Sequence, residues 1–193
     1  HKKNRNMQLI KEADILITFE KLRQDYSGLI MGGSVLNIIN RIFEQEYPNT
    51  TIFRLIYKTL NKIADSSEFN RIFFIFFLFH LSKHLGVMPN ITQCHFCNKL
   101  FVEGAIFSSN SKSLVCFDCH DFNTLDNNIT IDKLSLHLLD LINTTNIDDI
   151  TDIEITSEKL QELYNFLIFF MKYHINHMHN VKSLKEVEKI YYG

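Results

Sequence analysis

Long stretches of the sequence carry apolar residues three and four positions apart, the spacing that places them on one face of an α-helix. This pattern predicts helices over residues 26–46, about 50–64, 68–85, 129–143 and about 157–179. Few helix-breaking residues interrupt these stretches, since the 193 residues include only 2 Pro and 6 Gly. We therefore expect a mostly α fold, a helical bundle with a short β segment inserted in it.

The stretch 68–85 is apolar almost all round, which is typical of a helix at the centre of its domain. The other stretches are amphipathic, so each is expected to turn one face inward. The inward residues expected in 50–64 are Phe53, Ile56, Tyr57, Leu60 and Ile63. Those expected in 129–143 are Leu134, Leu138, Leu139, Leu141 and Ile142. Those expected in 157–179 are Leu160, Leu163, Tyr164, Leu167, Ile168, Phe170 and Met171.

Turn and cap residues suggest where these helices begin and end. Gly86, with Pro89 three positions later, predicts the end of the central helix. The pair Gly32–Gly33 marks a kink, a close helix contact or a helix start, and an N-cap at Ser34 is an equal alternative. Pro48 is expected to end the helix over 26–46. The other expected N-caps are Thr50 or Thr51, Ser67 and Ser157.

Two segments are rich in β-forming residues. Residues 7–19 are expected to form one or two extended pieces. The residues between the two cysteine pairs, around 101–107 and 114–115, predict a small ribbon of strands.

The apolar runs, the N-terminal residues and the net charge argue against a membrane-spanning protein, a secreted protein and a protein that binds nucleic acid by overall charge. The longest apolar run, residues 72–79, is far shorter than the roughly 20 residues that span a bilayer. No secretory signal is recognisable, so a cytoplasmic protein is expected. The formal net charge of −2 argues against nucleic-acid binding by overall charge, although a local basic patch would suffice.

The four cysteines provide the strongest chemical signal. Cys94, Cys97, Cys116 and Cys119 form two Cys-x2-Cys pairs separated by 18 residues, a spacing typical of structural zinc sites. Two disulfides or four free thiols are the alternatives. Four thiolates would close the coordination shell of Zn²⁺, so the site would stabilise the fold rather than perform catalysis.

Other candidate chemistry is weaker. The sequence has no phosphate-binding glycine loop and no nucleophile elbow, and we predict no catalytic or cofactor-binding residues beyond the metal ligands. His174, His177 and His179 could bind a metal, but histidines near a helix C-terminus also interact favourably with the helix dipole. Basic residues fall in three groups for which solvated helix faces are the simplest interpretation. The groups are Lys2, Lys3 and Arg5; Lys58, Lys62 and Arg71; and Lys182, Lys185 and Lys189.

The order of motifs resembles that of a known family. Residues 85–97, LGVMPNITQCHFC, are similar to the join between helix and first knuckle in bacterial RecO recombination mediators. Residues 107–119, FSSNSKSLVCFDC, resemble that family's second knuckle, and Lys182–Ser183 match its C-terminal Lys-Ser signature. The chain departs from the family pattern at the usual Gly-Gly before the second knuckle, where it has Ser111-Lys112-Ser113.

The resemblance implies a domain organisation. Residues 1–20 would be the remnant or exit segment of the family's N-terminal OB-fold, most of which is expected to lie outside this chain. Residues 21–193 would form the helical domain, with the zinc-binding insertion at about 90–125.

The resemblance also implies a function in recombinational repair. Proteins of the RecO type bind single-stranded and double-stranded DNA and anneal strands. With RecR they help load the recombinase RecA onto DNA coated by single-strand-binding protein, whose acidic C-terminal tail they bind. Arg71 with Phe73, Phe76 and Phe77 is one candidate for that tail site, although these phenylalanines could equally be plain core. Such a protein is not an enzyme, and it acts in the bacterial cytoplasm at the nucleoid.

Two other functions compete with this interpretation. A zinc-ribbon fragment of a transcription or translation factor would need a basic, aromatic ribbon surface, but the ribbon offers only Lys99 and Lys112. An enzyme would use the histidines of HINHMH, residues 174–179, as its metal site.

Overall fold

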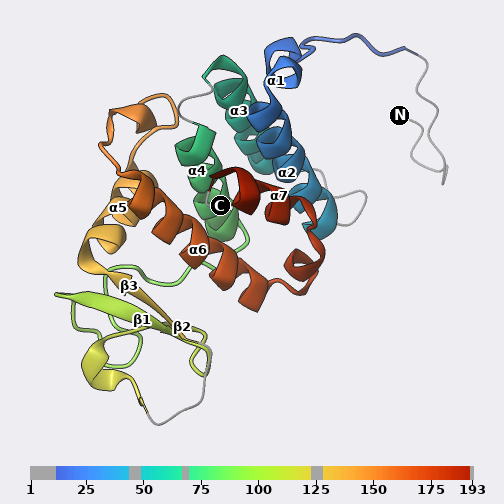
Figure 1. Cartoon of the computed structure of the whole chain (residues 1–193). Coiled ribbons are helices and arrows are strands. Elements are labelled where there is room, and N and C mark those ends of the chain that lie inside the picture. The colour runs from blue at the N-terminus through green and yellow to red at the C-terminus, as the bar shows by residue number, and fades with distance from the viewer. Residues whose placement is uncertain (1–11, 44–48, 67–69, 123–127, 192–193) are drawn as a thin grey trace.

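The computed structural model describes residues 12–43, 49–66, 70–122 and 128–191. These residues form a helical bundle with a three-stranded sheet at one end, which confirms the predicted fold class (Figure 1). The helices are α1 (Glu20–Gln24), α2 (Tyr26–Ile42), α3 (Thr50–Asp65), α4 (Asn70–His84), α5 (Lys133–Thr144), α6 (Ser157–His174) and α7 (Ser183–Tyr191). The strands are β1 (Gly104–Ser108), β2 (Ser113–Val115) and β3 (Ile129–Asp132), in the order β2-β1-β3 with both pairings antiparallel.

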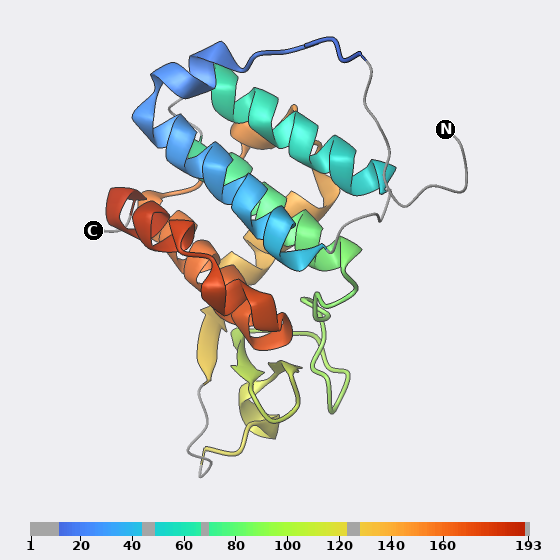
Figure 2. The same ribbon diagram turned by 90° about the vertical axis from the view of Figure 1, so that its right-hand side faces the viewer.

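Helix α4 forms the centre of the bundle, as its apolar sequence predicts. It packs against α2, α3, α5 and α6, and Figure 2 shows it behind the α2–α3 pair. The side chains of Phe74, Ile75, Phe77 and Leu78 are fully buried. The helix ends at the predicted glycine, because Gly86 takes a left-handed φ of 71°. In this turn the N–H of Val87 donates to the carbonyl of Ser82, the bond of a helix-ending glycine motif.

Helix α2 runs through both glycines instead of starting after them. It begins at Tyr26 after the N-cap Asp25, whose carboxylate accepts from the N–H of Gly28 at 2.7 Å, so the alternative start at Ser34 is wrong. A Cβ on Gly32 would lie 2.9 Å from Leu22 and 3.3 Å from Leu60. The glycine therefore serves the close helix contact that was one of the expectations.

Helix α3 turns three of the five predicted residues inward, Ile56, Leu60 and Ile63, but not Phe53 and Tyr57. Its N-cap is Asn49 rather than Thr50 or Thr51, and the Asn49 side chain accepts from two backbone N–H groups. Phe53 and Tyr57 are 66% and 43% exposed, whereas Leu60 and Ile63 are buried as expected. The inward stripe starts one residue earlier than predicted, because the buried partners of Leu60 and Ile63 are Ile52 and Leu55.

The predicted helix over 129–143 begins four residues late. Ile129–Asp132 forms β3, which pairs with β1, and α5 starts only at Lys133. The β-branched residues of this stretch complete the sheet, and Asp132 then caps α5. As a result Leu134, which was expected to face inward, is 51% exposed, and Leu136 is buried.

The C-terminal region also differs from the expected single long helix. Helix α6 is capped by Thr156 instead of Ser157 and ends at His174. A 3₁₀ helix, Asn176–Asn180, then turns the chain so that α7 packs against α2. Leu184 and Val187 are buried in that contact. The separate helix was not predicted, because its short apolar pattern covers only nine residues.

At the N-terminal side, residues 12–19 form no strand, so the expected extended β pieces are not found in the described part of this segment. The short helix α1, which was not predicted, follows it. Pro48 and Ser67, expected to end one helix and cap another, lie outside the described residues. None of the described helices combines the length and the apolar character needed to cross a bilayer.

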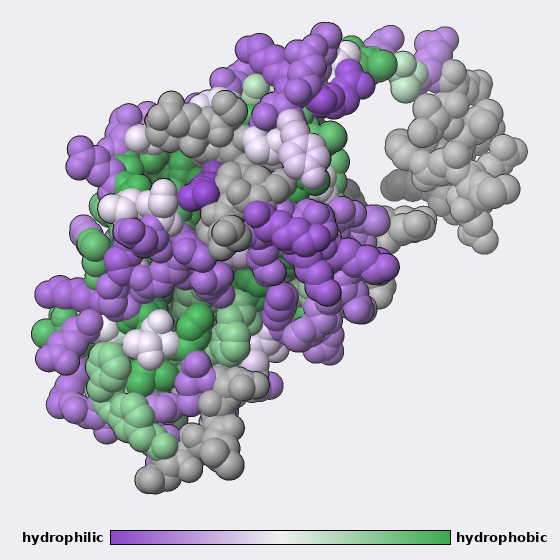
Figure 3. Space-filling view, viewed as in Figure 1, coloured by the Kyte–Doolittle hydropathy of each residue, from purple (hydrophilic) through white to green (hydrophobic). Residues whose placement is uncertain are grey.

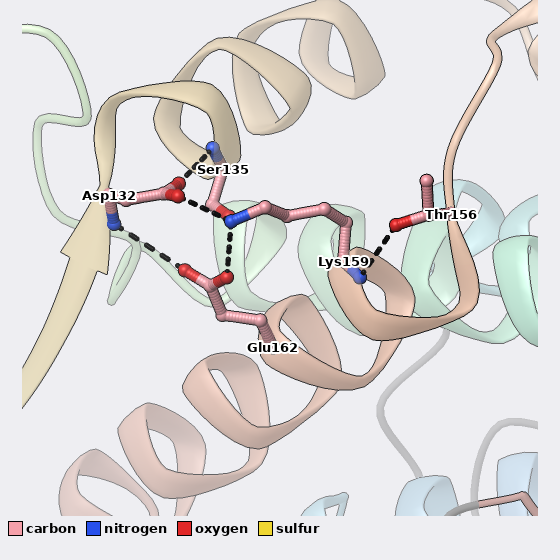
Figure 4. Close-up of polar contacts among 5 residues, drawn as sticks. All are labelled: Asp132, Ser135, Thr156, Lys159 and Glu162. Carbon is pink, nitrogen blue, oxygen red and sulfur yellow. Dashed lines mark hydrogen bonds and ion pairs between the residues drawn. The ribbon is translucent and has the colours of Figure 1, made fainter.

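A polar network joins the sheet to the bundle (Figure 4). The ammonium group of Lys159 on α6 pairs with the carboxylate of Asp132 and lies 2.6 Å from that of Glu162. The other carboxylate oxygen of Asp132 accepts from the N–H of Ser135 at 2.7 Å. Partial burial alone would raise the pKa of Asp132, but the hydrogen bonds from Lys159 and Ser135 hold it below its usual value.

Replacing Asp132 by alanine is expected to lower the free energy of unfolding by about 1–2 kcal/mol, because α5 loses its N-cap and Lys159 loses a partner. Asp132→Asn keeps the cap acceptor and should lose less than half as much. Urea unfolding of both variants measures the difference. Equal losses for the two variants would assign the effect to the ion pair instead of the cap.

Candidate metal centre

The first cysteine pair lies in a tight turn of irregular chain before the sheet. The N–H of Cys94 donates to the carbonyl of Lys99 at 2.9 Å, and the N–H of Asn98 donates to the carbonyl of Cys94 at 3.0 Å. Asn98 takes a left-handed φ of 58°, which asparagine tolerates better than most residues. The turn brings the side chain of Cys97 back toward that of Cys94.

The second pair follows β2 directly. Cys116 precedes the 3₁₀ helix Phe117–Cys119, in which the N–H of Cys119 donates to the carbonyl of Cys116 at 3.1 Å. Hydrogen bonds from backbone N–H groups join the first turn to β2 and to the start of the second turn. The N–H of His95 donates to the carbonyl of Leu114 at 3.0 Å, and the N–H of Cys116 donates to the sulfur of Cys94 at 3.3 Å.

The structure brings all four predicted metal ligands together. The sulfur atoms of Cys94, Cys97, Cys116 and Cys119 lie within 4.8 Å of one another, and those of Cys97 and Cys116 are 3.8 Å apart. A tetrahedral ion with metal–sulfur bonds of about 2.3 Å separates its ligands by about 3.8 Å. The cluster is therefore able to hold a metal ion, and its fit to four-sulfur coordination is close.

The thiols of the cluster are electrostatically unequal. Burial alone would raise the pKa of Cys94, but the backbone N–H groups of Cys97, Cys116 and Phe96 lower it to about 6. Hydrogen bonds with the sulfurs of Cys116 and Cys97 raise the pKa of Cys119 to about 12. Without a cation Cys119 stays protonated at neutral pH, so binding of a metal ion to all four sulfurs must release its proton.

The ribbon, which comprises the two cysteine turns and the sheet, has a small core of its own. Its other face packs against the helical bundle. Cys94 packs with Ile106 and Val115. On the other face Phe107 is fully buried, and its ring makes edge contacts with Phe170 and Tyr173 of α6. Gly104 permits the β1–β3 pairing, because a Cβ there would lie 2.5 Å from the carbonyl oxygen of Ile131.

On the face seen in Figure 3, hydrophilic residues cover most of the helical part.

The histidines proposed for an enzymatic metal site do not form a metal-binding group. In the described ranges, the four cysteines are the one group of three or more side chains placed to share an ion. His174 instead packs its ring 4.4 Å from that of Phe170, measured between centroids, and burial lowers its pKa. His177 and His179 are exposed on the 3₁₀ helix. The hypothesis of an enzyme at these histidines gains no support.

Three of the six described residues of the basic groups form ion pairs. Lys62 and Lys58 lie 2.8 and 3.8 Å from Asp148, and Lys189 lies 2.9 Å from Glu186. The first group, Lys2, Lys3 and Arg5, lies outside the described residues.

The phenylalanines named with Arg71 belong to the core. Phe73, Phe76 and Phe77 are 2%, 7% and 0% exposed, so they cannot line a surface groove and that part of the expectation is wrong. Arg71 itself lies at a surface pocket of about 530 Å³. The other pocket residues are Ile72, Ile150, Thr151, Ile153, Glu154, Ile155, Thr156 and Leu160.

Sequence reasoning missed this pocket because most of its wall comes from the segment before α6. No element was predicted for that segment, which lies between the helices expected over 129–143 and 157–179. Its isoleucines, Ile150, Ile153 and Ile155, were a signal that the loop contributes an apolar surface.

Comparison with known proteins gives consistent matches. Residues 23–185 match the family described as "Recombination protein O C terminal". A protein named DNA repair protein RecO from Alkaliphilus metalliredigens is 23% identical over 97% of this chain and 75% of its own length. The proteins of the same name from Prosthecochloris aestuarii and Caldicellulosiruptor bescii are 21% and 27% identical, over 98% and 68% of this chain. They are covered over 75% and 54% of their own lengths.

The family match spans the helices on both sides of the sheet as well as the cysteine cluster. It therefore covers the same motifs, in the same order, that suggested the resemblance. The chain belongs to the RecO C-terminal family.

Proposed function

We propose that this chain is the helical, zinc-stabilised part of a DNA repair and recombination mediator. The family match over residues 23–185 is the observation that carries the proposal. By its resemblance to RecO, the protein binds DNA, anneals strands and, with RecR, helps load the recombinase onto DNA coated by single-strand-binding protein. It does so by binding and not by catalysis, in the cytoplasm at the bacterial nucleoid.

The metal of the proposed structural site is one Zn²⁺ ion held by Cys94, Cys97, Cys116 and Cys119. Four clustered sulfurs are typical of zinc or of iron–sulfur centres, and the separation of two Cys-x2-Cys pairs favours zinc. Four thiolates leave no open coordination position, which supports a structural role. The ion would hold the two turns together so that the sheet can pack against α6.

The pocket at Arg71 is our proposed site for the C-terminal tail of single-strand-binding protein. An acidic tail with an apolar tip needs an apolar wall beside a cation. The pocket combines Arg71 with the side chains of Ile153, Ile155 and Leu160. Glu154 also lies at the pocket, and its negative charge would repel an acidic ligand. Removing this charge should therefore strengthen binding of the tail, whereas removing the charge of Arg71 should weaken it.

Replacing Arg71 by glutamine is expected to weaken binding of a fluorescent tail peptide about tenfold, through loss of a charge-assisted hydrogen bond. Replacing Glu154 by glutamine is expected to strengthen binding about twofold to fivefold, through removal of a like charge. Fluorescence anisotropy at constant salt measures both affinities.

Arg23→Gln is the matched control, because Arg23 lies on α1 and is exposed away from the pocket. Its affinity should stay within twofold of the parent chain. If Arg71→Gln and Arg23→Gln weaken binding equally, the peptide is attracted by general charge and the pocket is not its site.

A further inference from the structure

A second, smaller pocket lies where the end of α2 meets the start of α7. Its volume is about 160 Å³. It is lined by Asn37, Arg41, Asn180, Val181, Lys182 and Ser183. We propose that Arg41, Lys182 and Ser183 bind one phosphate group here. The inference rests on the proposed function in one respect, since it takes this phosphate to belong to a nucleic-acid backbone.

The pocket brings two cations together from distant parts of the sequence. Arg41 comes from the last turn of α2 and Lys182 from the turn before α7. No carboxylate lies among the described lining residues, and within the described residues neither cation takes part in an ion pair. Two like charges facing one small pocket repel each other, so a bound anion would relieve this repulsion.

Ser183 adds a donor that is already buried. Its hydroxyl oxygen is shielded from solvent and has no hydrogen-bond partner among the described residues. A buried hydroxyl without a partner is unfavourable, and a change of the Ser183 side-chain rotamer toward the pocket would let it donate to a phosphate oxygen there. The amides of Asn37 and Asn180 offer further donors at the same place.

The packing of α7 fixes the backbone that carries Lys182 and Ser183. Val181, Leu184 and Val187 are 5%, 2% and 0% exposed, and α7 packs along α2. The backbone of Lys182 and Ser183 therefore lies between buried residues, which keeps it beside the last turn of α2 that carries Arg41. Lys182–Ser183 is also the pair that matches the C-terminal family signature, and neither the zinc cluster nor the tail pocket gives it a role.

A phosphate group is the ligand whose chemistry fits this set. A guanidinium group binds two phosphate oxygens at once, an ammonium group adds a point charge, and a hydroxyl donates to an oxygen. The start of α7 contributes further positive potential. Along a DNA strand, one such pocket would fix one backbone phosphate without reading the base sequence.

The test uses the full chain with its zinc and three single variants: Arg41→Gln, Lys182→Gln and Ser183→Ala. Binding of a labelled single-stranded oligonucleotide is measured by anisotropy at several salt concentrations. Each charge variant should bind about tenfold more weakly. The slope of log affinity against log salt should fall by about 0.7, the value for one lost contact to a single strand. Lys185→Gln, an exposed lysine on α7 outside the pocket, should stay within twofold.

Inorganic phosphate is the second probe, followed by NMR shifts of the amides of residues 180–184. Shifts in the parent chain that are lost in Lys182→Gln support the pocket. If the pocket binds inorganic phosphate but no variant changes the affinity for the oligonucleotide, the ligand is free phosphate. That result would overturn the assignment of the pocket to a phosphate of the nucleic-acid backbone. Equal binding of all variants to both probes would overturn the pocket itself.

Two further outcomes separate this inference from the proposed function. Strong DNA binding that no pocket variant changes would leave the repair function intact and refute the site. No DNA binding by the parent chain, with phosphate shifts preserved, would refute DNA contact by this chain but support a phosphate pocket. Ser183→Ala guards against misfolding, because it should keep or raise the melting temperature while weakening phosphate binding.

Discussion

Replacing Cys94 by serine is expected to remove the metal ion and to unfold the ribbon that contains the sheet. Cys94 is 1% exposed and is held by backbone hydrogen bonds from both turns, so a hydroxyl in its place loses both a ligand and a packed side chain. In zinc-finger peptides, a structural zinc ion contributes about 10–16 kcal/mol of apparent binding free energy. Loss of even part of this exceeds most single-residue effects.

Elemental analysis should find one zinc per chain in the parent protein and almost none in Cys94→Ser. Loss of NMR shift dispersion for β1 and β2 would report unfolding of the ribbon. His177→Ala is the control, because His177 is exposed and outside the cysteine cluster, and it should retain full zinc. Zinc content unchanged in Cys94→Ser would rule out the four-sulfur site.

Replacing Phe77 by alanine is expected to lower the free energy of unfolding by about 3–5 kcal/mol. The side chain of Phe77 is fully buried in α4, with its ring centroid 6.2 Å from that of Phe74. Truncation would remove a large apolar surface from the core and leave a cavity that the surrounding helices cannot fill. Urea or thermal unfolding measures the loss.

The matched control is Phe53→Ala, which makes the same chemical change at a residue that is 66% exposed. This variant should change the unfolding free energy by about 0.5 kcal/mol or less. A loss at Phe53 as large as that at Phe77 would mean that α3 turns the originally predicted face inward.

Elements with an unmistakable local pattern could be predicted from the sequence. Helix α4 has no polar face to orient, so its central position follows from its composition alone. Gly86 ends it because glycine adopts left-handed φ without strain. The cysteine cluster was predictable because two tight turns can bring four sulfurs together only in a narrow range of spacings.

Features that depend on tertiary packing could not be predicted in this way. The stripe of Phe53 and Tyr57 and that of Ile52 and Leu55 are both apolar, so only the position of neighbouring helices decides which faces inward. Ile129–Asp132 forms a strand because β1 offers it a partner, which a helical pattern alone cannot reveal.

The two proposed binding pockets also depend on tertiary packing, so they could not be predicted from the sequence. The Arg71 pocket joins α4 to residues about 80 positions away, and the Lys182 pocket joins α7 to the end of α2. The sequence identified Arg71 and the Lys-Ser pair as residues of interest, but it gave the wrong neighbours for Arg71. Phe73, Phe76 and Phe77 lie in the core, and the wall of the pocket comes from the segment before α6 instead.

The proposed role of this chain is that of a partner-binding domain in a recombination mediator. Its most direct test is the affinity of the zinc-loaded chain for intact single-strand-binding protein and for the same protein without its acidic C-terminal tail. We expect binding to the intact protein and at least tenfold weaker binding to the truncated one. Equal affinity for the two proteins, or no binding to either, would contradict this proposed role.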